Sequence, residues 1–171
     1  IHGSNVAPIV PYLLPNNIGP HALDWLDNAI VKVPKAKASM IWQGKLGSYP
    51  YLNNNGVFDI RVNLINSHLK PWSTWPLITD LNSVLYFHKD QFKAKIFNAN
   101  TLGVKTKNTI IEIPHMHGKH EVHYILADGN LSGEGKDVEN FLLNSPLKKN
   151  LSTVLSLLKI QKPVGVSLHL K

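Results

Sequence analysis

The chain has 171 residues, with 18 basic against 11 acidic side chains and a formal net charge of +7. It contains no cysteine, which excludes a disulfide framework, a cysteine-ligated metal and a cysteine nucleophile. Its 43% hydrophobic share suits a globular domain, and no stretch approaches the about 18 consecutive apolar residues of a membrane-spanning helix. Because the chain lacks an initial Met and ends inside an alternating run, we expect a fragment of a longer protein.

The positive charge is almost entirely lysine, since Arg61 is the one arginine. Base-specific nucleic-acid recognition depends on arginine, whose rigid fork reads guanine and grips phosphate. The lysines are also scattered in the manner of solvated strand faces, so we expect no nucleic-acid partner. Attraction to anionic lipid headgroups is a second physical use of the same charge.

The first predicted elements are a proline-rich entry segment over residues 1–19 and a short amphipathic helix over 21–30. Pro8, Pro11 and Pro15 restrict the entry segment to extended or turn pieces. From position 21 the apolar residues fall at helical spacing.

Alternation of apolar and polar residues then predicts strands separated by turn-sized gaps and by no helix. Such a series indicates an antiparallel meander over about residues 37–128. Long strands twist and curl, and the apolar face of the sheet needs a cover. The predicted strands span residues 38–46, 56–69, 80–88, 91–99, 109–113 and 121–127.

The C-terminal part returns to helical spacing. It predicts two short helices within about 136–158, interrupted at Pro146, and a last strand over about 163–171. The fold class is therefore α+β and mainly β. We expect one long, twisted, curled antiparallel sheet in a single unit, residues 20–171, with short helices over its apolar face.

Reaction chemistry is not visible in the sequence. There is no phosphate-binding glycine loop and no Gly-x-Ser-x-Gly motif, and the carboxylates are few and separated. We therefore expect that the protein is not an enzyme and that it binds no cofactor. Trp72 and Trp75, bracketed by prolines, favour a strand-to-strand corner over a ligand platform.

A histidine-rich stretch gives the one dense cluster of metal-ligating residue types. His-x-His spacing on a strand places both imidazoles on one face, so a metal-binding module stays open as an alternative. A polar connection that is rich in histidine by chance is the simpler interpretation. The candidate ligands are His115, His117, His120 and His123.

Taken together, the order of short motifs resembles a middle segment of the YhdP branch of the AsmA-like proteins of Gram-negative envelopes. The resemblance covers roughly residues 20–170, and it depends on the order and spacing of the motifs, since none of them is specific alone. The motifs are ALDWLDNA (22–29), GKL followed by YPY (44–51), GVF (56–58), WPLITDL (75–81), ANTLGV (99–104) and FLLNSPL (141–147).

The resemblance implies a non-enzymatic segment of a long periplasmic protein that is anchored in the inner membrane and moves phospholipids between inner and outer membranes. Acyl chains would slide along an apolar β-sheet groove, with the membrane contacted through other parts of the protein. Kinship with other AsmA-like proteins gives the alternative of a scaffold in outer-membrane protein assembly, with envelope protein partners.

The predicted groove residues are the apolar members of the alternating runs. They are Met40, Trp42, Phe58, Ile60, Val62, Leu64, Leu85, Phe87, Phe92, Ile96, Ile111, Ile113, Tyr124 and Leu126.

Overall fold

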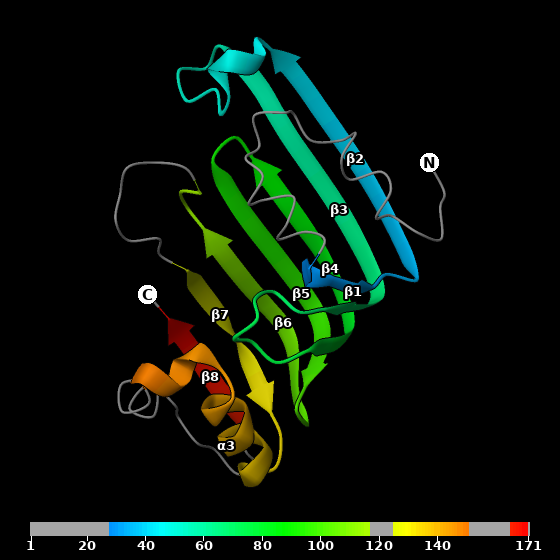
Figure 1. The fold of residues 1–171 in the computed structure, drawn as a ribbon, viewed down its shortest axis with the longest axis vertical. Helices are drawn as coiled ribbons and strands as arrows, with labels where there is room; N and C mark the ends of the chain where they lie inside the picture. The colour runs from blue at the N-terminus through cyan, green and yellow to red at the C-terminus, as the bar shows by residue number, and fades with distance from the viewer. Residues whose placement is uncertain (1–27, 117–124, 151–164, 171) are drawn as a thin grey trace.

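A computed structural model describes residues 28–116, 125–150 and 165–170. In these ranges the protein is an antiparallel sheet with one α-helix at an end (Figure 1). The strand order is β1-β3-β4-β5-β6-β7-β8, and β2 pairs with β3 beside β1. The mainly β, antiparallel fold class predicted from alternation is therefore confirmed.

The elements follow the chain as a meander. The strands are β1 (Ile30–Lys32), β2 (Lys35–Gly44), β3 (Gly56–Leu69), β4 (Ile78–His88), β5 (Gln91–Thr101), β6 (Val104–Ile113), β7 (Leu126–Ser132) and β8 (Gly165–Leu170). The helices are the 3-10 turns η1 (Leu46–Ser48) and η2 (Pro146–Asn150) and the α-helix α3 (Gly135–Leu143).

The helices predicted on either side of the meander lie only partly within the described residues. The helix predicted over 21–30 lies outside them except for its last three residues, of which Ile30 already opens β1. The second half of the predicted C-terminal helical region, from residue 151, also lies outside them. The first half is present as α3 and η2.

The last strand of the meander runs further than the sequence predicts. Instead of ending at residue 127, β7 continues through Gly129 to Ser132. A side chain at Gly129 would meet Thr109 of the neighbouring strand, with its Cβ 2.6 Å from the Thr109 Cβ. This glycine is therefore not a turn residue, because it makes room for Thr109 inside the sheet.

A line of β-bulges crosses the strands near the α3 end. Asn66 in β3, Asp80 in β4 and Asn108 in β6 have φ values of 50°, 52° and 52°, in the left-handed region that Asn and Asp tolerate best. The register shifts at each of them, between Leu64 and Ser67, between Thr79 and Asn82, and between Lys107 and Ile110. We call these three positions the bulge line.

Side-chain amides connect two members of the bulge line, Asn66 and Asp80. The Asn66 N–H donates to Asn82 Oδ1 at 3.1 Å, and Asn82 Nδ2 donates to Asn98 Oδ1 at 3.0 Å. Asn98 Nδ2 and Asn100 Nδ2 donate to the Asp80 carbonyl and carboxylate, each at 2.7 Å. These bonds replace the ladder bonds that the bulges interrupt.

The core has two centres. One lies on the sheet around Leu64, Leu81, Ile96 and Ala99. The other lies under α3, where Val138, Phe141 and Leu142 pack on Val104, with Trp75, Leu131 and Leu147 around them. Figure 1 shows α3 at the end of the sheet where β6 begins and β7 ends, so the helix covers this end alone.

Candidate functional site

One face of the sheet carries rows of apolar side chains that run from strand to strand. Residues directly opposite each other in an antiparallel pair point to the same face, so the pairing register defines each row. We call this surface the apolar face. Its rows are Trp42 and Phe58; then Met40, Ile60, Phe87, Phe92 and Ile113; then Ala38, Val62, Leu85, Ala94, Ile111 and Ala127; then Ala36, Leu64, Ser83, Ile96 and Thr109.

No charged residue occurs in these rows, of which the first joins two strands and the other three cross five to six. Burial within the described residues is uneven along them. Phe58, Leu64 and Ile96 keep 2–8% of their surface exposed, whereas Met40 on β2 keeps 37%. The middle rows are half-buried, so the described elements cover the apolar face only in part.

Aromatic side chains close one end of the apolar face. Trp42 Nε1 donates a 2.7 Å hydrogen bond to the Tyr51 hydroxyl, and the Tyr51 side chain is completely buried. The Tyr49 ring packs edge-on against Phe58 with centroids 4.9 Å apart. We call these four residues the aromatic cluster. The connection between β2 and β3 thus folds back over the sheet.

Glycines make room for that fold. A side chain at Gly56 would lie 2.6 Å from the Gln43 carbonyl oxygen and against the Tyr51 ring. Gly44 has a φ of 131°, a conformation that L side chains rarely adopt, and it also meets the Tyr51 ring. The aromatic cluster therefore depends on both glycines.

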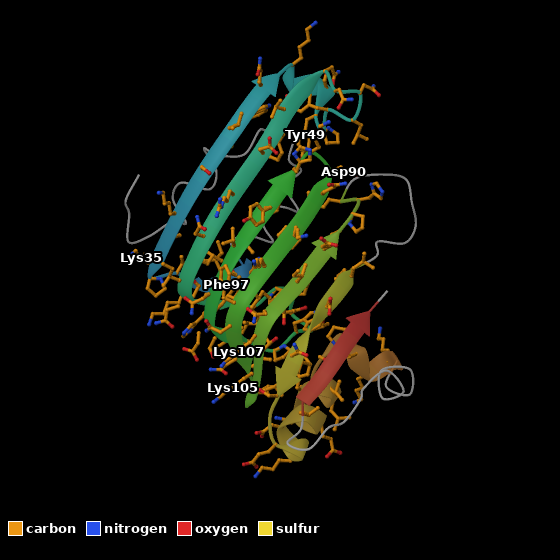
Figure 2. The ribbon with its side chains drawn as sticks, turned by 180° about the vertical axis from the view of Figure 1, so that it is seen from behind. Lys35, Tyr49, Asp90, Phe97, Lys105 and Lys107 are labelled. Carbon is orange, nitrogen blue, oxygen red and sulfur yellow. The ribbon has the colours of Figure 1, made fainter. Side chains whose placement is uncertain are left out.

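A buried carboxylate lies beside the aromatic cluster. The Asp90 side chain keeps 3% of its surface exposed, and His115 Nδ1 is 3.3 Å from its Oδ2. Burial and, second, the charge of Asp90 raise the pKa of Tyr49 to about 12. Tyr49 and Asp90 lie at the same end of the sheet in Figure 2. This phenol stays protonated at neutral pH, which suits a structural role.

The opposite surface, which we call the polar face, carries the charges (Figure 2). Lys93 and Glu112 form a 2.6 Å ion pair across β5 and β6, and Asp59 pairs with His88. The Arg61 guanidinium lies 5.4 Å from the centre of the Tyr86 ring. The two faces of one sheet therefore differ in chemistry, apolar on one side and ionic on the other.

The register brings most of the predicted groove residues together on the apolar face. Tyr124 lies outside the described residues. Leu126 lies opposite Glu112 and so shares the polar face, because β7 pairs with β6 in a register that puts Ala127 beside Ile111. The remaining twelve are Met40, Trp42, Phe58, Ile60, Val62, Leu64, Leu85, Phe87, Phe92, Ile96, Ile111 and Ile113.

Sequence reasoning missed the small and the out-of-phase members of this surface. Ala94 and Ala127 sit in its rows but are too small to stand out in an alternating pattern. Leu81 follows the same alternation as Leu85 and Phe87 and packs with Leu64, although sequence reasoning did not name it. Ala99 packs in the same cluster although it is out of phase with Ala94 and Ile96 on β5. Asn98, which pairs with Asn82 beside a register shift, is the signal that could have revealed this change of phase.

Of the four predicted histidine ligands, His115 alone belongs to the described residues. His115 contacts Asp90, whereas His117, His120 and His123 lie outside the described residues. In residues 28–116, 125–150 and 165–170, no group of three or more His, Asp or Glu side chains is arranged to hold a metal ion. Among the same residues, no helix is long and apolar enough to span a membrane.

The chain is similar to known proteins of one family. The profile of the YhdP protein family matches residues 1–171. The chain is 30% identical over 159 residues to the intermembrane phospholipid transporter YhdP of Escherichia coli K12. That alignment covers 93% of this chain and 12% of the relative, so the chain spans about an eighth of its length. No solved structure matches.

Proposed function

The chain belongs to the YhdP protein family, and from this membership we propose that it is a segment of a phospholipid conduit between two membranes. In this proposal, acyl chains lie on the apolar face while the polar face stays in water. The segment is non-enzymatic and works in the periplasm. Its cargo is inferred from the relative, whose name assigns it intermembrane phospholipid transport.

The observation that carries the proposal is the uncharged set of rows across the sheet. An acyl chain gains about 0.8 kcal/mol for each methylene group that leaves water. Met40, Ile60 and Phe87 are consecutive members of one row, on β2, β3 and β4, and none of them is fully buried. This row is therefore a contact surface for a hydrocarbon chain.

The covered ends of the apolar face support one direction for the acyl chains, across the strands. The aromatic cluster covers one end of the apolar face, and α3 with Trp75 covers the other. The middle rows between these ends run across the strands, toward β2 at one side. We therefore propose that lipid lies on the middle rows, along the path from strand to strand.

Site-specific photocrosslinking in cells that make the full-length protein tests the proposal. Phe87 and Tyr86 form a matched pair, because both are half-buried aromatic residues of β4 that point to opposite faces. Met40 and Ile41 form a second pair on β2, with 37% and 63% of their surface exposed. A benzophenone side chain at Phe87 or Met40 is expected to form phospholipid adducts, and one at Tyr86 or Ile41 is not.

Equal lipid adducts from both faces, or none from either, would contradict the conduit. Protein adducts from Phe87 and Met40 in place of lipid would favour the alternative predicted above, a scaffold in outer-membrane protein assembly. The second pair matters because Ile41 is more exposed than Met40. Accessibility alone would therefore give the reverse of the expected result.

A further inference from the structure

The outer edge of the sheet at β1 and β2 is positively charged throughout. Residues 28–45 include four lysines and no aspartate or glutamate. We call Lys32, Lys35, Lys37 and Lys45 the lysine rim, and all four are exposed. Among the described residues, β2 pairs with β3 alone, so its other side is a free edge. Lys35 marks the start of this edge in Figure 2.

Several other lysines have a described partner, whereas Lys105 and Lys107 on β6, like the lysine rim, form no ion pair among the described residues. Lys93 is paired with Glu112, and the Lys95 ammonium lies 5.6 Å from the centre of the Phe97 ring. Lys89 donates a 2.5 Å hydrogen bond to Asn54 Oδ1. Within the described ranges, no side chain of the lysine rim forms an ion pair.

Strand alternation places these charges directly beside the apolar face. Ala36, Ala38 and Met40 belong to its rows, whereas Lys35 and Lys37 lie between them with the opposite orientation. On an edge strand a lysine stem is long and flexible enough to carry its ammonium group past the edge. Along β2, therefore, a hydrocarbon surface lies beside two lysines that form no ion pair among the described residues.

We propose that the lysine rim binds the headgroup phosphates of phospholipids whose acyl chains lie on the apolar face, and that it selects anionic lipids. This inference depends on the proposed function, which supplies the position of the chains. Electrostatic complementarity supports it, because a lysine near an anionic lipid surface contributes about 1 kcal/mol. An anionic headgroup keeps its net charge at the rim, whereas a zwitterionic one brings a cation of its own.

Exposed lysines on an edge strand have a simpler use, which is to prevent pairing with the edge of another sheet. The two roles make different predictions. Edge protection depends on the charges but has no relation to the lipid headgroup, whereas phosphate binding changes which lipid is bound.

The test uses a benzophenone side chain at Met40 of the full-length protein in cells, with lipid adducts identified by mass spectrometry. The measured quantity is the ratio of phosphatidylglycerol to phosphatidylethanolamine in the adducts, relative to that ratio in the membrane. The rim variant is Lys35→Gln with Lys37→Gln. The matched control is Lys105→Gln with Lys107→Gln, which removes the same charge from β6 inside the sheet.

The unmodified rim is expected to enrich phosphatidylglycerol. The rim variant is expected to lower that enrichment by about fivefold for each lysine removed, up to about thirtyfold for the two. Lys35→Arg with Lys37→Arg keeps it, and the control variant leaves it unchanged. An equal ratio in the rim variant and the control would overturn the proposal, including the case in which the rim variant merely self-associates. Absence of any lipid adduct at Met40 and at Phe87 would overturn the proposed function, and the lysine rim with it.

Discussion

The two ends of the apolar face are closed by different chemistry. At one end a loop folds back and a hydrogen bond joins Trp42 to the buried Tyr51, in a region where β2 and β3 pair without a register shift. At the other end a helix packs its apolar side on Val104, beyond the bulge line. The first closure depends on aromatic and polar detail and on two glycines, and the second on hydrophobic burial. The rows between them are mostly half-buried among the described residues.

The largest expected effect concerns the helical end. Phe141→Ala removes a side chain that keeps 6% of its surface exposed and packs with Val138, Leu142 and Trp75. Removing a buried phenylalanine side chain costs about 3–5 kcal/mol. Urea unfolding followed by tryptophan fluorescence should show a fall of that size in the free energy of unfolding. The exposed Leu143→Ala on the same helix is the control, and an equal loss there would contradict the packing described.

A somewhat smaller loss is expected at the aromatic end. Gly56→Ala introduces a Cβ against the Tyr51 ring and the Gln43 carbonyl, where backbone must move to admit it. Overpacking of this kind costs about 1–3 kcal/mol. The same urea measurement applies, with Gly47→Ala as control, since nothing lies within 4 Å of a Cβ at that position. Equal stability of the two variants would show that the loop does not pack as described.

The stability of the aromatic end should also depend on alkaline pH. The pKa of Tyr49 is raised from 10.0 to about 12, so the folded state holds this proton more tightly than the unfolded state. The contribution is complete below pH 10 and is lost as the pH rises through 12. A shift of two pKa units corresponds to about 2.7 kcal/mol, which solvent screening of this partly exposed ring reduces. Urea titrations between pH 9 and 12 should therefore show a steeper decline in the parent chain than in Tyr49→Phe. Parallel declines would contradict the shift.

The smallest of these stability effects is expected from the hydrogen bond across the aromatic cluster. Trp42→Phe keeps a ring against Phe58 but removes the Nε1 donor to the Tyr51 hydroxyl. Loss of one such bond costs about 0.5–1.5 kcal/mol. Because the Tyr51 side chain is completely buried and its hydroxyl would lose its partner, we expect a cost in the upper part of this range. Tyr51→Phe alone and the double variant complete a thermodynamic cycle. A coupling energy of zero would show that the hydrogen bond between Trp42 and Tyr51 does not stabilise this end.

Sequence reasoning predicts the meander well because its signals are local. The run from Gly56 to Leu69 alternates clearly and follows a chain of asparagines, and β3 has these same bounds. The placement of most apolar residues on one face follows from the same alternation. Bulges break that logic, since one extra residue reverses the phase of all that follow. Ala99 therefore joins the core although the alternation of Phe92, Ala94 and Ile96 places it on the other face.

The closures of the apolar face are not local and escape such reasoning. Nothing in the run Tyr49-Pro50-Tyr51 predicts that its second tyrosine is completely buried, because the partner, Trp42, belongs to another element. In the sequence the lysines of the rim are scattered like the others, and their position on a free edge depends on strand order. Register and order come from tertiary pairing, and alternation along one strand does not determine either of them.

The bulge line makes the length of these strands matter more than the identity of their residues. Asn66, Asp80 and Asn108 accommodate a left-handed backbone, which glycine also adopts at little cost. Deleting one of them, by contrast, would turn every later side chain of that strand to the opposite face. In β3 and β4 the deletion would separate Ser67 from Leu81. Across relatives, these positions should tolerate substitution to glycine but resist insertion and deletion, because the number of residues in each strand sets which side chains face the core.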